Sequence, residues 1–199
     1  MLVYDCEIVK AIPSRDTGAL EGIEYCAGWH DHANMGISVI GAYDYDTGRY
    51  RVFCADNFGE FEDLAHATDL LVGFNNVGFD DKLIGASGLH ASPSTPRYDL
   101  LAESWVAAGL APTWQSFDTH GGFGLDAICS ATFARTKTGH GALAPVDWQR
   151  GRVGSVIDYC LADVWLTKQL FDLALAGKPI INPKTGEPMT LREPKLRDQ

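Results

Sequence analysis

The chain has 199 residues, of which 46% are hydrophobic and 21% charged. This length and composition predict one globular domain with a sizeable core, and we expect no second domain. The formal net charge of −10 argues against a protein that binds nucleic acid through a basic surface, because the field of the whole molecule repels phosphate. Either the substrate is not a polyanion, or a local feature reverses the sign of the charge.

Nothing in the sequence predicts membrane insertion or export. A span needs roughly 20 consecutive apolar residues, which the chain lacks, and its first residues carry acids instead of the basic and apolar regions of a secretory leader. The cysteines are odd in number, scattered and set in apolar surroundings, which predicts reduced thiols in a cytoplasmic protein and no disulfide framework. They are Cys6, Cys26, Cys54, Cys129 and Cys160.

The first part of the chain predicts an antiparallel meander. Hydrophobic patterns typical of strands cover residues 1–9, 36–46 and 49–55, and Asp46-Thr47-Gly48 predicts the hairpin turn between the last two. Residues 60–68 predict a helix. The apolar run at 70–75 is typical of a buried parallel strand, and a further helix is predicted from Phe79 to Ile84.

In the second part, predicted strands and helices alternate. Residues 98–108 predict a strand end or a helix, 124–133 a helix, and Val153 to Ala176 one long helix that Gly177-Lys178-Pro179 ends. A small hairpin is expected around Lys184-Thr185-Gly186. A meander followed by alternating elements predicts an α/β fold, a mixed sheet flanked by helices. We assign residues 1–177 to this domain and 178–199 to its C-terminal hairpin and tail.

The opening stretch MLVYDCEIVKAI places two carboxylates in a predicted strand. Asp5 and Glu7 are two residues apart, so their side chains point to the same face and lie side by side. Two such carboxylates repel each other, and a divalent cation such as Mg²⁺ or Mn²⁺ would relieve that repulsion. An edge strand with two solvent-exposed acids is the alternative that these residues leave open.

Two more acids lie at positions where a fold can use them. Asp80 follows an apolar strand and begins a helix, where an α/β sheet presents functional groups, although helix capping also explains an Asp there. Tyr159 and Asp163 are four residues apart in the long helix, so the phenol and the carboxylate project from one face. A hydrogen-bonded Tyr and an exposed Asp are the alternative for this pair.

The order of these motifs resembles the DEDD superfamily of 3′–5′ exonucleases. The order is Asp-x-Glu on a first strand, GFNNVGFD at 73–80 after a later strand, and YCLADVWL at 159–166 on a late helix. The tyrosine places the resemblance in the DEDDy subclass. The second and third motifs are similar to those in the proofreading domains of family B DNA polymerases, and the resemblance spans residues 2–172. It implies a ribonuclease H-like fold.

The resemblance also implies a two-metal mechanism. Asp5, Glu7, Asp80 and Asp163 would hold two divalent ions, Mg²⁺ or Mn²⁺, which clamp the entering and leaving oxygens of a phosphodiester. Tyr159 would orient the attacking water. The clustered cations would reverse the local field, whereas the rest of the surface stays repulsive, so we expect weak, salt-sensitive binding unless a protein partner supplies a basic surface.

Substrate contacts are implied by the same resemblance. Single-stranded 3′ ends, DNA rather than RNA, would be received near Cys6, Ile8, Asn75, Asn76 and Phe79, where aromatic stacking suits a single strand. Lys137, in the loop ARTKTGHGA, would face the scissile phosphate, with an ordinary solvated loop as the alternative. A zinc site from Cys26, His30 and His32 lacks a second ligand pair at a suitable spacing.

Three functions remain open from sequence. The first is a free-standing DNA 3′–5′ exonuclease that releases nucleoside monophosphates in the cytoplasm of a bacterial or phage-infected cell. The second is an exoribonuclease of the same superfamily, which recognition of the 2′-hydroxyl would distinguish. The third is a non-catalytic domain that binds nucleic acid or acts as a scaffold. A cleavage assay on labelled single-stranded DNA and RNA, with metal or chelator, separates them.

Overall fold

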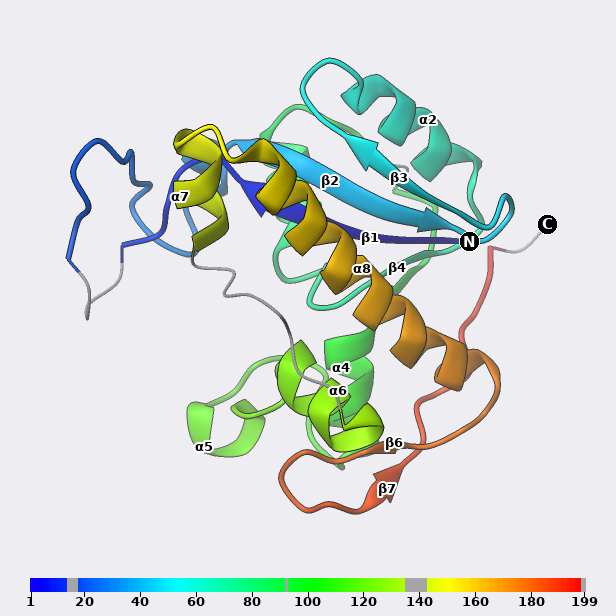
Figure 1. The fold of residues 1–199 in the computed structure, drawn as a ribbon. Coiled ribbons are helices and arrows are strands. Elements are labelled where there is room, and N and C mark those ends of the chain that lie inside the picture. The colour runs from blue at the N-terminus through cyan, green and yellow to red at the C-terminus, as the bar shows by residue number, and fades with distance from the viewer. Residues whose placement is uncertain (14–17, 92, 135–142, 198–199) are drawn as a thin grey trace.

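A five-stranded mixed sheet forms the centre of the molecule, and helices cover both of its faces (Figure 1). The computed structural model describes residues 1–13, 18–91, 93–134 and 143–197. The sheet has the order β3-β2-β1-β4-β5; its strands are β1 (Leu2–Ile8), β2 (Ile37–Asp44), β3 (Arg49–Phe53), β4 (Leu71–Gly73) and β5 (Arg97–Asp99).

Strand directions confirm the predicted architecture. The pairs β1–β2 and β2–β3 are antiparallel, which is the predicted meander, and the pairs β1–β4 and β4–β5 are parallel. The result is a ribonuclease H-like α/β arrangement. Residues 98–108, for which sequence left a strand end or a helix open, contain both, because β5 ends where a helix begins at Leu100.

The predicted helices are present, and short ones join them. The helices are α1 (His32–Met35), α2 (Phe58–Ala67), α3 (Asp80–Ala86), α4 (Leu100–Ala107), α5 (Phe117–His120), α6 (Leu125–Phe133), α7 (Ala144–Gln149) and α8 (Val153–Leu175). The sequence did not predict α1, α5 and α7. With four to six residues each, they are too short to show a helical hydrophobic period.

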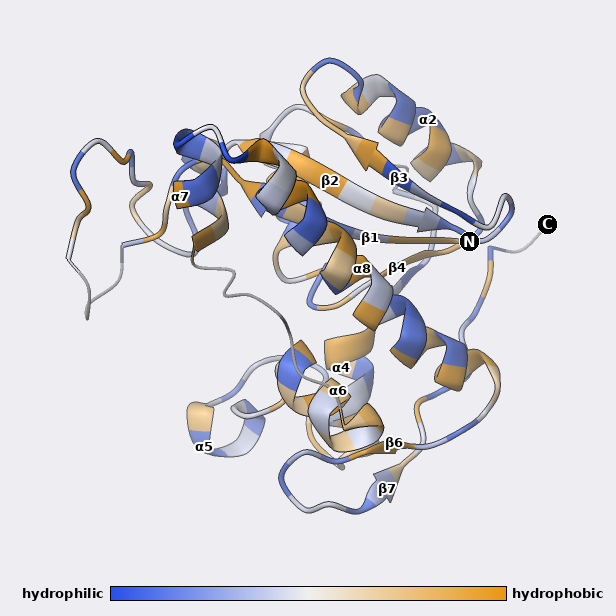
Figure 2. Ribbon diagram, viewed as in Figure 1, coloured by the Kyte–Doolittle hydropathy of each residue, from blue (hydrophilic) through white to orange (hydrophobic). Residues whose placement is uncertain are grey.

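Alternation along β1 builds two cores. Leu2, Tyr4, Cys6 and Ile8 face the side that α2 and α3 cover, whereas Val3 faces a second core formed with α4, α6 and α8. Figure 2 shows β4 and much of β1 and β2 as hydrophobic, while β3 begins hydrophilic and ends hydrophobic. Each large apolar side chain buried in these cores contributes about 1.5–3 kcal/mol relative to exposure.

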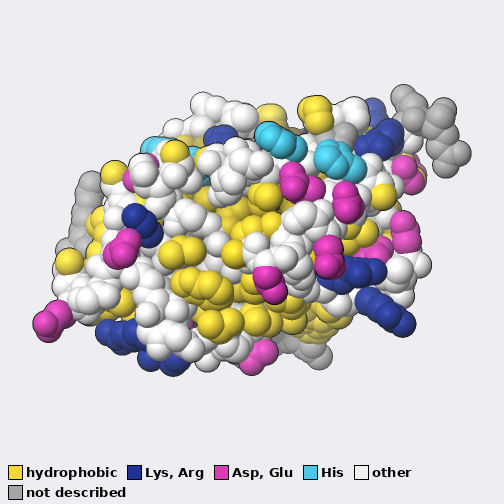
Figure 3. Space-filling view, turned by 90° about the horizontal axis from the view of Figure 1, so that it is seen from above, with side chains coloured by type: hydrophobic (Ala, Val, Ile, Leu, Met, Phe, Trp, Pro, Cys, Tyr) yellow, Lys and Arg dark blue, Asp and Glu magenta, His cyan; other side chains and the backbone are white. Residues whose placement is uncertain are grey.

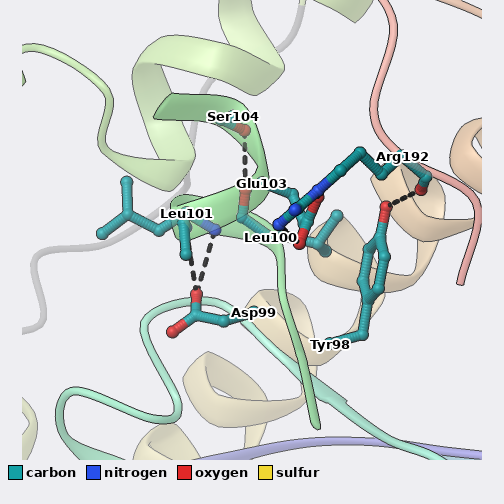
Figure 4. Close-up of polar contacts among 8 residues, drawn as sticks. Tyr98, Asp99, Leu100, Leu101, Glu103, Ser104 and Arg192 are labelled. Carbon is teal, nitrogen blue, oxygen red and sulfur yellow. Dashed lines mark hydrogen bonds and ion pairs between the residues drawn. The ribbon is translucent and has the colours of Figure 1, made fainter. Parts of the chain in front are cut away.

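The C-terminal segment packs on the second core. Strands β6 (Ile180–Ile181) and β7 (Pro188–Met189) form the predicted hairpin, and Ile180 and Met189 are buried against α6 and α8. Farther on, the Tyr98 hydroxyl donates to the carbonyl of Arg192, whose guanidinium pairs with Glu103 (Figure 4). Residues 178–197 thus continue the fold of residues 1–177.

Within the described residues, no helix is both long enough and apolar enough to cross a membrane.

Candidate metal centre

Asp5 and Glu7 lie on the face of β1 that α8 covers. The sequence predicted that they share a face, and the structure places one carboxylate oxygen of each, together with the Cys160 sulfur, within 4.8 Å of one another. Glu7 is only 8% exposed, so the edge-strand alternative, with two solvated acids, does not describe this strand. β1 is instead an interior strand between β2 and β4.

A glycine opposite Asp5 lets α8 approach the sheet closely. Gly41 pairs with Asp5 in the β1–β2 register, and a Cβ atom at Gly41 would lie 2.8 Å from the Cys160 sulfur and 3.2 Å from a Val164 methyl group. No larger residue fits there unless α8 moves. The Cys160 thiol therefore reaches β1, where its sulfur lies 3.4 Å from the Asp5 carbonyl and 3.7 Å from Asp5 Oδ2.

Asp163 joins this group from the next turn of α8. Its side chain is 6% exposed. Burial raises the pKa of the Cys160 thiol, and the charges of Asp5, Glu7 and Asp163 raise it further. Asp163 lies three residues beyond Cys160 on α8, one turn from the thiol that contacts Asp5.

Asp80 reaches the same stretch of β1 from the other side. A Cβ atom at Gly73 would lie 2.5 Å from the Asn76 Cβ, so this glycine permits the tight turn that leads from β4 to α3. β4 pairs with β1 only at Leu2 and Val3. The Cys6 amide beyond them donates to Asp80 Oδ1 at 2.9 Å.

The electrostatics of Asp80 are those of a buried acid. It is 4% exposed, and burial raises its pKa to about 7, although the hydrogen bond from the Cys6 amide favours the charged form. Burial also raises the pKa of the Cys6 thiol, with further contributions from the charges of Asp80 and Asp5. The carboxylates of Asp80 and Asp5 therefore both lie near Cys6. We call Asp5, Glu7, Asp80 and Asp163 the carboxylate cluster.

The donor set of this cluster fits a divalent cation. Burying several carboxylates together is costly unless positive charge compensates them, and carboxylate oxygens are the ligands that Mg²⁺ and Mn²⁺ prefer. Asp5, Glu7 and Cys160 form the one group of three potential ligands found within the described residues. Cys160 is a softer donor that the sequence did not reveal, because a buried Cys in a helix reads as a core residue.

Cys26, which the sequence analysis did not support as a zinc ligand, has other contacts. Its thiol donates to the carbonyl groups of Ala11 and Gly28.

Tyr159 lies beside Cys160 at the N-terminal half of α8. Its half-buried ring packs against a small core formed by Val39, Ala144 and Val156. The tyrosine and Asp163 are four residues apart on one helix, as predicted.

The remaining predicted substrate residues have different surroundings. Asn75 is exposed, with a positive φ of 64°. Asn76 is fully buried and donates to the Tyr4 hydroxyl at 3.3 Å. Cys6 and Ile8 turn their side chains into the core on the α2 side, and the Cys6 thiol also interacts with Asp80. Lys137 lies outside the described residues.

Asp99 fixes the turn that carries Asp80, and sequence reasoning missed it. Its carboxylate accepts from the amides of Asn75 at 2.8 Å and Val77 at 3.3 Å in the turn, and from Leu101 at 3.0 Å and Ala102 in α4 (Figure 4). Burial raises its pKa. An Asp between a short strand and an apolar helical stretch was the available signal, since Asp is a preferred helix N-cap residue.

A second acid at the start of α3 belongs to a different group. Asp81 accepts from the Tyr4 hydroxyl through Oδ1 and pairs with Arg97 Nε at 3.2 Å through Oδ2. The hydroxyl of Tyr4 also accepts from Asn76. Burial, followed by the charge of Asp81, raises the pKa of Tyr4. We call Tyr4, Asn76, Asp81 and Arg97 the Asp81 network.

The face of the molecule seen from above carries dispersed charges. Figure 3 views the molecule from above and shows hydrophobic side chains in the middle of this face, with acidic, basic and histidine side chains dispersed around them. The described residues visible there form no continuous basic surface. This agrees with the net charge of −10.

No protein-family model matches the chain, and no curated protein matches it. Among solved structures, a family B DNA polymerase from the hyperthermophilic archaeon Pyrobaculum calidifontis is similar, with a TM-score of 0.56 and 18% identity. The match covers 87% of this chain but 24% of the polymerase chain. At this level of identity the similarity shows the fold: this chain shares the fold of one part of that polymerase.

Proposed function

We propose that this chain is a metal-dependent 3′–5′ exonuclease of the DEDDy type. One observation carries the proposal: ligand atoms of Asp5 and Glu7 on β1 and of Cys160 on α8 lie within 4.8 Å of one another, and Asp80, at the start of α3, accepts from the Cys6 amide at 2.9 Å. Segments far apart in the sequence thus meet at β1, and Asp163 follows Cys160 by three residues on α8. The fold shared with a part of a DNA polymerase supports a role in acting on nucleic acid.

The carboxylate cluster would hold two divalent ions, Mg²⁺ or Mn²⁺. Such ions supply Lewis acidity and a water made acidic enough to attack a phosphodiester at neutral pH. The side chains of the protein would position these ions. Asp5, Glu7 and Asp163 would hold positive charge between β1 and α8, and Asp80 would hold it from the side of Cys6. Burial keeps Glu7, Asp80 and Asp163 in place, since each has little room to turn toward solvent, whereas Asp5 is partly exposed.

Tyr159 is the residue we assign to the attacking water. A phenol is a weak base at neutral pH, so its task is to orient rather than to remove a proton. Its hydroxyl can do so from the same helix that supplies Asp163, because residues four apart project together. The acid must reach the cation, whereas the phenol need reach only the water.

The substrate we propose is the 3′ end of single-stranded DNA. Asn75 and Phe79 lie in the turn that ends at Asp80, and the backbone of Cys6 and Ile8 runs along the same edge of β1. Lys137 would contact the scissile phosphate. Because the chain carries a charge of −10, binding should be weak and salt-sensitive, and a partner protein with a basic surface would strengthen it.

The test is cleavage of 5′-labelled single-stranded DNA and RNA with Mg²⁺, Mn²⁺ or a chelator. We expect metal-dependent shortening from the 3′ end, release of mononucleotides, and a block by a 3′-phosphate. Asp163→Asn should abolish it. Asp158→Asn is the matched control, because Asp158 is an exposed acid on the same helix. Preference for RNA would make the chain an exoribonuclease, and cuts within a circular single strand would overturn the exonuclease assignment.

A further inference from the structure

Three aromatic rings meet next to Asp80, and two of them belong to a segment that the proposed function does not use. Trp29 and His32 belong to the connection between β1 and β2. Their ring centroids lie 6.0 Å and 5.5 Å from that of Phe79, and the rings are tilted by 66° and 56°. Trp29 nevertheless remains 65% exposed. A large ring that is held at one edge and open to solvent is available to a ligand.

The turn that presents Trp29 is tightly built. The carboxylate of Asp31 accepts from the Ala27 amide at 2.7 Å and from Asn34 at 2.6 Å. The amide of Asp31 donates to the carbonyl of Gly28 at 3.0 Å. These bonds close the chain around Trp29. The hydrogen bond from Ala27 is also the main cause that lowers the pKa of Asp31.

Other contacts tie this turn to the sheet. Cys26 and Met35, on either side of the turn, are buried in the core beneath β1. Gln149 of α7 donates to the carbonyl groups of Val9 and Glu24 and accepts from the Glu24 amide. The position of Trp29 is therefore set by the fold, and binding to it needs little further ordering of the chain.

Phe79 joins the aromatic rings to the carboxylate cluster. It directly precedes Asp80, whose carboxylate accepts from the Cys6 amide between Asp5 and Glu7. A single strand whose 3′ end reaches the cluster would place a base within reach of these rings. Stacking also suits the charge of this chain, because a base is neutral, so the overall negative field does not oppose the contact.

We propose that Trp29, supported by His32 and Phe79, is a stacking site for one base of a single-stranded nucleic acid. This inference rests on the proposed function and adds a contact from the β1–β2 connection. Losing one stacked base typically weakens binding roughly 5- to 100-fold. Since stacking displaces no counterion, the loss should leave the salt dependence of binding unchanged, whereas loss of a phosphate contact lowers the slope of log K against log salt by about 1.

The experiment measures binding of 5′-fluorescein-labelled single-stranded DNA to the full chain in the Asp163→Asn background, so that the probe is not degraded. Trp29→Ala should raise Kd roughly 5- to 100-fold with an unchanged salt slope, and Trp29→Phe should restore most of the affinity. Trp114→Ala is the matched control: Trp114 is 54% exposed and packs near Trp105 and His120. It should bind as the parent does.

A series of probes with one abasic site locates the stacked base. At that position the abasic probe should bind the parent as weakly as the intact probe binds Trp29→Ala, and combining both changes should add nothing. An unchanged Kd for Trp29→Ala, an equal loss in Trp114→Ala, or a changed salt slope would overturn the stacking site. Because binding is read without cleavage, a chain that stacks a base yet never hydrolyses DNA would support this site and refute the exonuclease.

Discussion

Asp80 and Asp81 are neighbours at the start of α3, yet they belong to differently built groups. Asp81 is paired on both oxygens, with the Tyr4 hydroxyl and with Arg97. Asp80 accepts from the Cys6 amide, and burial raises its pKa to about 7. One carboxylate is satisfied by the protein itself. The Asp80 carboxylate is instead buried near further acids, which costs free energy unless positive charge compensates it.

The difference separates stability from function along a single strand. Tyr4 points from β1 to Asp81, and Asp5, the next residue, points to the opposite face, where Glu7 and Cys160 lie. A matched polar network stabilises the fold in one arrangement. A cluster of buried acids destabilises it, and such clusters are found where a site needs them. Substitutions in the two groups should therefore have opposite effects.

The largest expected effect is on the rate of cleavage. Asp5→Asn keeps the size of the side chain but removes a charge from the carboxylate cluster, and it should lower the metal-dependent rate at least about 10³-fold. Without metal, its melting temperature should equal or exceed that of the parent, because a repelling charge is gone. Thermal melts with and without Mn²⁺ check this. A strongly destabilised metal-free variant would mean that Asp5 has a structural role.

Much of this comparison could be predicted from sequence because it depends on local periodicity. Alternation in β1 placed Asp5 and Glu7 on one face. The apolar run before Gly73 predicted a parallel strand with Asp80 at its end, and the long hydrophobic pattern after Val153 predicted the helix that carries Asp163. Each of these inferences needs only the geometry of one element.

What the sequence did not reveal depends on contacts between distant segments. Cys160 lies beside Asp5 and Glu7 in the candidate metal centre because Gly41 lets α8 approach β2 closely. No local sequence pattern predicts that approach. Asp99 holds the turn that bears Asp80, 19 residues earlier in the numbering. The partnership of Asp81 with Arg97 crosses from α3 to β5. In a sequence, a charged residue that faces water cannot be distinguished from one that pairs with a residue of a distant segment.

The second-largest expected effect is a loss of stability when the Asp81 network is disrupted. Asp81→Ala leaves the buried Tyr4 hydroxyl and the Arg97 guanidinium without this carboxylate, which should lower the free energy of unfolding by about 3 kcal/mol. Urea unfolding at neutral pH measures it, with an unchanged m-value. Below the unfolding transition the cleavage rate per folded molecule should stay within about threefold of the parent, since Asp81 holds no ion. A variant as stable as the parent would contradict this account of the Asp81 network.

The smallest expected effect is on the pH dependence of the free energy of unfolding, and it distinguishes Asp80 from Asp81 without any assay of activity. In the metal-free fold the pKa of Asp80 is about 7, whereas in the unfolded chain an Asp titrates near 4. At pH values between these two pKa values, Asp80 keeps its proton in the folded state but has released it in the unfolded state. The free energy of unfolding should therefore fall as pH rises from about 4 to about 7, by up to about 1.4 kcal/mol per pH unit from this group.

Asp80→Asn cannot titrate, and the oxygen of its amide can still accept from the Cys6 amide. Its free energy of unfolding, measured by urea denaturation in the presence of chelator, should therefore fall less steeply over that pH range. Asp158→Asn, on the surface of α8, should follow the parent, and parallel curves for Asp80→Asn and the parent would show that Asp80 is charged in the metal-free fold.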